Sequence, residues 1–217
     1  MRGDTMTKLL LIRHGQSVSN LRGVFTGHLN LELTDLGHQQ AALTSEFIRN
    51  NYTVDAVYAS DLCRAADTGR AVADPLGLPL HTDTRLREIY AGIWEGKSFD
   101  ELTASFPAYA VFRGDIGTCQ TDGGESVAQL SQRVLEAFTE IAQANDGKTI
   151  VIATHATPIR AIMTHCKKYS LAQMKDVAWV TNASVTEVIY ENGTMKLGKI
   201  CQDEHLGSIV SRFPSNV

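Results

Sequence analysis

The sequence predicts an α/β fold with three layers, in which a mostly parallel sheet is covered by helices on both faces. Two short apolar runs, at 9–12 and 149–153, have the length of buried parallel strands. Segments with helical spacing alternate with strand-like segments, which is the order that crossover connections produce. Near the C-terminus, Asn192-Gly193 lies between two strand-like runs and indicates a β-hairpin.

The composition is that of a folded globular protein. Hydrophobic residues make up 43% and charged residues 20% of the 217 residues, which excludes a disordered, collagen-like or disulfide-rich chain. A chain of this length is expected to bury roughly 70% of its unfolded surface. We therefore expect one domain over 1–217, with 1–6 as a loose tail.

Three strands and two helices are expected in the first half of the chain. Thr34 is a candidate N-cap for a helix that runs to about Asn50, because apolar residues recur there at helical spacing. A second helix is expected over 64–74, where Pro75 and Gly77 would end it. The strands are expected at Lys8–Arg13, Val54–Ala59 and Pro79–Thr82.

The second half begins with a short helix that a capping box at Ser98 starts and Pro107 ends. The stretch 107–124 is rich in glycine and polar residues, so 97–124 is expected to be a surface excursion near the site. A strong amphipathic helix is expected over 125–145. The remaining elements are a central strand at Thr149–Ala153, a helix whose first residue is Pro158, and a hairpin of Ser184–Tyr190 and Met195–Ile200.

Charge and cysteine usage restrict the partners and the compartment. The net charge is −4 and no long basic run exists, so neither nucleic acid nor a membrane surface is expected as a partner. The four cysteines are far apart and form no CxxC pair, which is typical of reduced thiols in a cytoplasmic protein. The N-terminal apolar run is too short for a signal peptide or a membrane span.

Polar, chemistry-bearing residues follow three of the predicted strands. Arg13-His14-Gly15 follows the first strand, Arg64 comes shortly after the second, and His155 follows the strand at 149–153. Because sites in open α/β sheets form outside the carboxyl ends of the strands, these side chains are expected to meet. Two guanidinium groups would bind phosphate oxygens bidentately, and their charge would keep a nearby imidazole neutral and nucleophilic.

Six segments in this order resemble the histidine phosphatase superfamily, the phosphoglycerate mutase-like enzymes. A weaker similarity lies at His205-Leu206, and no role is assigned to it. The six segments are LLLIRHGQSVSN at 9–20, TGHLNLELTDLGHQQA at 26–41, ASDLCRAADT at 59–68, LREIYAGIWEG at 86–96, GGES at 123–126 and THATPIR at 154–160.

The resemblance implies that this chain is a phosphatase that works without a metal or cofactor, through a phosphohistidine. His14 would be the nucleophile, with its other ring nitrogen held by the Gly15 carbonyl. Glu88 would be the general acid and then the base that activates water. The transferring phosphoryl group would be bound by Arg13, Arg64 and His155. The substrate pocket would be completed by Gly15, Asn20, Thr26, Gly27 and Ala156.

Several alternatives stay open at this stage. Glu95, Glu125 or Asp61 could be the acid instead of Glu88. The chain could be a mutase that returns the phosphoryl group to the same substrate, or a non-catalytic phosphate-binding module. The mutases of the family usually have a longer insertion with paired arginines after the glutamate motif, and an arginine directly after the glutamate. Here 97–124 is short, Arg113 is alone and Glu88 is followed by Ile89, so the chain resembles the phosphatases and water is the acceptor that this resemblance implies. The substrate is expected to be a small phosphorylated metabolite, and a homodimer is possible by resemblance.

The other histidines have no spacing typical of metal ligands, and Trp94 is expected in the core or the pocket wall. These histidines are His28, His38, His81, His165 and His205.

Overall fold

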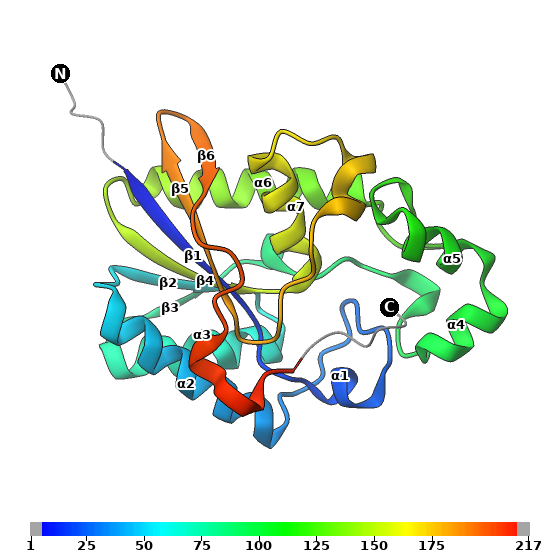
Figure 1. Cartoon of the computed structure of the whole chain (residues 1–217), viewed down its shortest axis with the longest axis horizontal. Helices are drawn as coiled ribbons and strands as arrows, with labels where there is room; N and C mark the ends of the chain where they lie inside the picture. The colour runs from blue at the N-terminus through cyan, green and yellow to red at the C-terminus, as the bar shows by residue number, and fades with distance from the viewer. Residues whose placement is uncertain (1–5, 212–217) are drawn as a thin grey trace.

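A six-stranded sheet forms the centre of the computed structural model, which describes residues 6–211 (Figure 1). The expected tail at 1–6 lies outside the described residues apart from Met6. The strand order is β3-β2-β4-β1-β5-β6, so β4 and β1 lie in the middle. The strands are β1 (Thr7–Arg13), β2 (Ala56–Ala59), β3 (Leu80–Thr82), β4 (Thr149–Thr154), β5 (Val185–Glu191) and β6 (Thr194–Leu197).

The sheet is parallel over β1 to β4 and antiparallel at β5 and β6. Parallel pairing is what the apolar runs predicted, because both faces of these strands are buried. The hairpin between β5 and β6 turns at Asn192 and Gly193, whose φ angles are 51° and 75°. These are the residues that a type I′ turn prefers.

Helices cover both faces of the sheet, which confirms the predicted three-layer architecture (Figure 1). Leu10 and Ile12 of β1 belong to the core on the side of α2 and α3, whereas Leu9 and Leu11 belong to the core on the side of α6 and α7. Alternate side chains of a strand point to opposite faces, so one apolar run serves two cores. The covering helices are α2 (Asp35–Asn51), α3 (Cys63–Leu76), α6 (Val127–Ala144) and α7 (Ala156–Cys166).

Two helix ends differ from the prediction. Pro75 lies inside α3, and the helix ends at Gly77, whose φ of 65° is the left-handed conformation that glycine tolerates. Pro75 has no N–H and so removes one donor from the last turn of the helix. Helix α7 begins at Ala156, with His155 as N-cap, so Pro158 is its third residue and not its first. Thr34 caps α2 as predicted, since its side chain accepts from Gly37 N.

The prediction of a surface excursion at 97–124 differs most from the structure. The segment contains α4 (Phe99–Ser105), α5 (Pro107–Gly114) and a 3-10 helix (Ile116–Thr118). Tyr109, Phe112 and Ile116 are buried in the core on the α6 side of the sheet. The segment therefore has an apolar helical face that its glycine and polar content does not indicate. Ser98 does cap α4, but Glu101 pairs with Lys97 instead of closing the capping box.

No helix among residues 6–211 is long and apolar enough to cross a membrane.

The remaining elements of the fold are short. The short elements are α1 (Val18–Arg22) and 3-10 helices at Thr84–Leu86, Gly92–Trp94, Leu171–Asp176 and Glu204–Ile209.

Candidate active site

One pocket lies at the carboxyl ends of β1 and β4 and is lined by most of the predicted site residues. Two predicted residues, Gly15 and the fully buried His155, are not part of its described lining. The basic side chains of Arg13 and Arg64 line it together with His14 and Glu88. The predicted substrate-binding residues that also line it are Asn20, Thr26, Gly27 and Ala156. The phosphoryl pocket, as we name it, is therefore built by segments far apart in the sequence.

His14 is buried and fixed in one orientation. Its Nδ1 lies 2.7 Å from the Gly15 carbonyl oxygen, which can only accept, so Nδ1 carries the proton and Nε2 keeps its lone pair. Burial, followed by the charges of Arg64 and Arg13, holds the pKa of His14 well below its usual value. The imidazole is consequently a neutral nucleophile at neutral pH. Gly15 is required here, because a Cβ at this position would lie 2.4 Å from the Gly37 carbonyl oxygen.

Backbone carbonyls hold the two arginines in place. Arg13 Nη1 donates to the Val180 carbonyl over 2.7 Å. Arg64 donates from Nη1 to Leu29 O over 2.8 Å and from Nη2 to Gly27 O over 2.9 Å. Its Nε is buried and has no hydrogen-bond partner in the described part of the chain.

Burial lowers the pKa of Arg13 to about 9 and that of Arg64 to about 10, which leaves both charged at neutral pH. Two rigid, buried cations beside a neutral imidazole form an environment for an anion.

His155 lies against His14 and is fully buried. The two imidazole centroids are 5.2 Å apart, with the rings edge to face. His155 Nε2 is 3.0 Å from Ser60 Oγ, whereas its Nδ1 has no hydrogen-bond partner among residues 6–211. Burial and the charge of Arg64 hold the pKa of His155 well below its usual value. A neutral ring with one unbonded nitrogen can serve an oxygen of a bound phosphoryl group.

Glu88 is the carboxylate of the phosphoryl pocket. Its Oε1 accepts from Ile89 N over 2.8 Å, and its Oε2 accepts from Thr157 N over 3.3 Å. The three other candidates for the acid do not belong to the described lining of the pocket. They have other partners: Glu125 pairs with Arg133, Asp61 with Arg87, and Glu95 accepts from the backbone N–H groups of His28 and Ala91.

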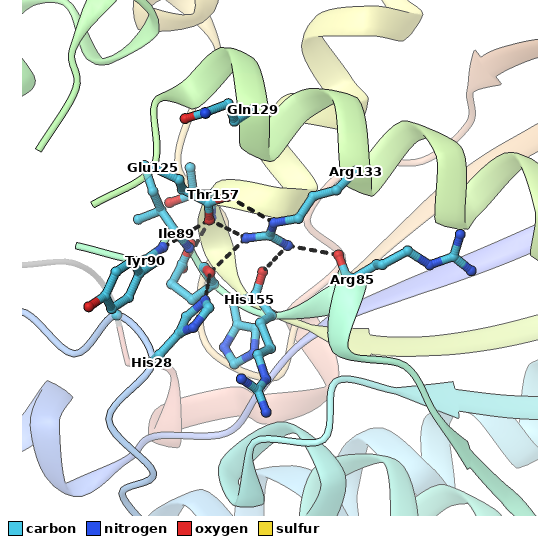
Figure 2. Close-up of polar contacts among 12 residues, drawn as sticks. His28, Arg85, Ile89, Tyr90, Glu125, Gln129, Arg133, His155 and Thr157 are labelled. Atoms are coloured by element: carbon cyan, nitrogen blue, oxygen red, sulfur yellow. Dashed lines mark hydrogen bonds and ion pairs between the residues drawn. The ribbon is translucent and has the colours of Figure 1, made fainter. Parts of the chain in front are cut away.

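Arg133 of α6 holds the backbone that carries Glu88 (Figure 2). Its Nη1 donates to the carbonyls of Arg85 and Arg87 over 2.7 and 2.8 Å, and its Nη2 donates to the Glu88 carbonyl over 2.9 Å. The guanidinium also pairs with Glu125, which in turn accepts from Tyr90 N over 2.9 Å. The Arg133 side chain thus connects α6 to three carbonyls of the segment that carries Glu88, the acid-bearing segment.

Asn182 supports the other side of the pocket. Its Nδ2 donates to the His14 carbonyl over 2.9 Å and to Asn20 Oδ1 over 3.2 Å. Because Ser17 N also donates to Asn20 Oδ1, the amide nitrogen of Asn20 is left for a ligand. Gly27 has a φ of 52°, and a Cβ there would lie 2.1 Å from Glu95 Oε1.

The sequence reasoning missed several of these residues. Asn182 follows no strand-end motif, and Arg133 appears only as a polar position on an amphipathic helix. Phe99, Phe112 and Trp179 complete the apolar wall of the pocket. Phe99 and Phe112 lie in the 97–124 segment, which the sequence predicts to be near the site.

No cluster of three or more His, Cys, Asp or Glu side chains suited to a metal ion occurs within residues 6–211.

Comparisons with known proteins agree with this geometry. Residues 9–203 match the family model of the histidine phosphatase superfamily (branch 1). A putative phosphoserine phosphatase 2 from Hydrogenobacter thermophilus is 31% identical, over 93% of this chain and 100% of its own length. A metal-independent phosphoserine phosphatase from Arabidopsis thaliana is 28% identical, over 94% of this chain and 85% of its own.

Solved structures are similar over nearly the whole chain. YhfR from Bacillus stearothermophilus superposes with a TM-score of 0.88 at 29% identity, covering 92% of this chain and 99% of the other. Phosphoserine phosphatase from Entamoeba histolytica in complex with 3-phosphoglyceric acid has a TM-score of 0.82 at 30% identity, with the same coverage of 92% and 99%.

Proposed function

Because the chain belongs to the histidine phosphatase superfamily, we propose that it hydrolyses small phosphomonoesters through a phosphohistidine formed on His14. The family and the phosphatase activity expected from the sequence are confirmed by the family match and by the relatives named above. The observation that carries the residue roles is the His14 ring, fixed through Nδ1 by Gly15 and placed with two arginines and Glu88 in one pocket.

In the first step, His14 Nε2 attacks phosphorus while the bond from phosphorus to the leaving oxygen breaks. Glu88, in its protonated form, gives its proton to that oxygen. Arg13 and Arg64 bind the equatorial oxygens, where negative charge is concentrated in the transition state. His155 adds a hydrogen bond from its unbonded nitrogen. The products are a free alcohol and a phosphohistidine.

In the second step, water replaces the alcohol. The Glu88 carboxylate takes a proton from the water as its oxygen attacks phosphorus, and the bond from phosphorus to Nε2 breaks. Inorganic phosphate leaves, Glu88 is again protonated, and His14 is again neutral. The same carboxyl group acts as acid and then as base, so the cycle is closed without a metal.

Water is the acceptor that the relatives support. They include glucosyl-3-phosphoglycerate phosphatase from Mycolicibacterium vanbaalenii, which is 32% identical over 71% of this chain and 72% of its own length. A pocket lined by a few polar groups and by aromatic side chains such as Phe99 and Phe112 suits a small phosphorylated ligand. The mutase considered from the sequence would need a second acceptor hydroxyl and would release no phosphate.

A phosphate-release screen tests this proposal. A panel of small phosphomonoesters, with p-nitrophenyl phosphate included, is incubated with the protein in the presence of EDTA and without any bisphosphate. We expect release by the wild type and none by His14→Ala. His81→Ala, an exposed histidine in β3, is the matched control and should keep full activity. Activity in His14→Ala, or a requirement for metal or for a bisphosphate primer, would contradict the proposal.

A further inference from the structure

Two buried polar side chains hold the backbone turn that follows His14, and neither is part of the described lining of the phosphoryl pocket. The hydroxyl of Thr68, on α3, accepts a hydrogen bond from Gly15 N over 3.1 Å. The amide oxygen of Gln40, on α2, accepts one from Gln16 N over 2.8 Å. Both side chains are fully buried. Two helices therefore make specific polar contacts with the residues next to the proposed nucleophile.

Gly15 is the residue of this turn whose backbone is least restricted by its own side chain, because it has no Cβ. Glycine is required there by its close approach to Gly37. The Gly15 carbonyl must nevertheless keep one direction, because it accepts the proton on His14 Nδ1 and so decides which ring nitrogen is protonated. The packing that requires glycine thus leaves the direction of this carbonyl to contacts from other segments.

Gln40 acts on the peptide group that contains this carbonyl. In a planar trans peptide group, the Gly15 carbonyl and the Gln16 N–H point in opposite directions and rotate together. The hydrogen bond from Gln16 N to Gln40 Oε1 therefore fixes the direction of the Gly15 carbonyl. The amide nitrogen of Gln40 donates to the Ile209 carbonyl over 2.7 Å, and this acceptor requires that the amide oxygen faces Gln16.

Thr68 acts on the preceding peptide group, which joins His14 to Gly15. Its hydroxyl donates to the Arg64 carbonyl over 2.7 Å, so its lone pairs are available to the Gly15 N–H. The carbonyl of the same peptide group accepts from Asn182 Nδ2 over 2.9 Å. Both peptide groups that meet at the Gly15 Cα are thus held by side chains of other elements.

We propose that Thr68 and Gln40 are positioning residues for the nucleophile. By fixing the backbone at Gly15, they keep the proton of His14 on Nδ1 and the lone pair on Nε2. This inference rests on the proposed function, in which Nε2 attacks phosphorus. Without these contacts the Gly15 carbonyl would turn away, and the tautomer with its proton on Nε2 would become populated. That tautomer has no lone pair on Nε2 and does not attack phosphorus.

Nitrogen NMR measures this tautomer directly. Protein with ¹⁵N-labelled histidine rings is observed in mildly alkaline buffer, where histidine rings are neutral. A ring nitrogen that carries a proton resonates far from one that does not, and His14→Ala identifies the His14 signals by their absence. We expect the wild type to have a protonated Nδ1 and an unprotonated Nε2. In Thr68→Val and in Gln40→Met, the two nitrogen shifts of His14 should move toward each other.

Activity should follow the tautomer. We expect kcat/KM to fall at least about tenfold in Thr68→Val and in Gln40→Met, because a misplaced reacting group loses much of its rate advantage. The fall should be equal for an alkyl and an aryl phosphate, since attack by His14 is common to both. Competitive inhibition by inorganic phosphate should change by less than about twofold, because both arginines of the phosphoryl pocket are kept.

The matched variants separate the hydrogen bond from general packing. Thr68→Ser keeps the hydroxyl and should have the wild-type tautomer and activity. Thr164→Val is the control for loss of a buried threonine hydroxyl, because Thr164 lies in α7 and its Oγ1 donates to the Arg160 carbonyl over 2.7 Å, as that of Thr68 does to Arg64. It should change neither the tautomer nor kcat/KM.

The outcomes distinguish this inference from the proposed function. A proton on Nε2 of His14 in the wild type would overturn the positioning role without any variant. Folded variants of Thr68 and Gln40 that keep the wild-type tautomer, or a loss in Thr68→Ser equal to that in Thr68→Val, would overturn it as well. Absence of phosphate release by the wild type would overturn the proposed function, whereas the NMR signals would still show whether the two side chains fix the His14 ring.

Discussion

Replacing Arg133 with glutamine should show whether catalysis needs Glu88 to be held in position, because the variant keeps the Glu88 side chain and removes its support. Arg133 donates to the carbonyls of Arg85, Arg87 and Glu88 and pairs with Glu125, so Arg133→Gln breaks four contacts while Glu88 itself is kept (Figure 2). We expect Glu88 to lose its orientation because its backbone would no longer be tied to α6.

The cost to stability can be estimated from burial. The side chains of Arg133 and Glu125 are 21% and 16% exposed. Breaking a fully buried pair costs about 3–5 kcal/mol, so a loss of about 2–4 kcal/mol is expected for this partly exposed one. A domain with ordinary stability would remain folded. Urea denaturation measures this loss.

The effect on catalysis should depend on the leaving group. A general acid contributes about 10²–10⁴-fold, and a misplaced one should forfeit at least about tenfold of that with an alkyl phosphate. p-Nitrophenolate leaves without needing a proton, so kcat/KM for p-nitrophenyl phosphate should fall much less. The assay compares kcat/KM for the two substrates, because this parameter reports the steps up to phosphoryl transfer to His14.

The matched control is Arg85→Gln. The Arg85 side chain pairs with Asp83 and Glu140 and donates to no carbonyl of the acid-bearing segment. It should leave the ratio between the two substrates unchanged. An equal fall for both substrates in Arg133→Gln would refute the positioning role, since a general loss of folding or of phosphate binding would explain it.

Three further perturbations test the site. Arg64→Ala should lower kcat/KM by about 10²–10³-fold through loss of transition-state binding, whereas Arg70→Ala on the same helix should have no effect; similar losses in both would contradict the assignment. Gly15→Ala should reduce both activity and stability, because its Cβ would lie 2.4 Å from the Gly37 carbonyl oxygen, and an unchanged melting temperature would be inconsistent with that close approach. Stability should fall as the pH drops below about 6.5, because histidines take up protons in the unfolded chain there, while burial holds the folded pKa of His14 and His155 lower. Urea denaturation at several pH values should show this slope, and its absence in the wild type would count against two buried neutral imidazoles.

Several residues of the site could be predicted because they directly end or follow predicted strands. Arg13 and His14 end or follow β1, and His155 follows β4, which pairs with β1 in parallel. Parallel neighbours put their carboxyl ends at one edge, so the sequence contains the information that these side chains meet. The apolar runs also predict the central strands, because a strand buried on both faces has no polar alternation.

Contacts between distant segments were not predictable in the same way. Arg133 and Asn182 donate to backbone carbonyls of segments that are distant in the sequence. Every residue has a backbone carbonyl, so no residue type marks these acceptors in the sequence. The structure of 107–124 differs from the predicted surface excursion because Tyr109 and Phe112 are buried on a short helix among glycines and polar residues. Short helices are stabilised by tertiary packing more than by propensity, so their local sequence signal is weak.

Direct detection of a phosphohistidine tests the central claim best. The wild-type protein is mixed with an excess of p-nitrophenyl phosphate, quenched in alkali within the first turnovers, digested and analysed by mass spectrometry. We predict one phosphoryl group, stable in base and labile in acid, on the peptide that contains His14 and absent from His14→Ala. Phosphate release by the wild type with no phosphoryl group on that peptide, or with the group on another side chain, would contradict the account.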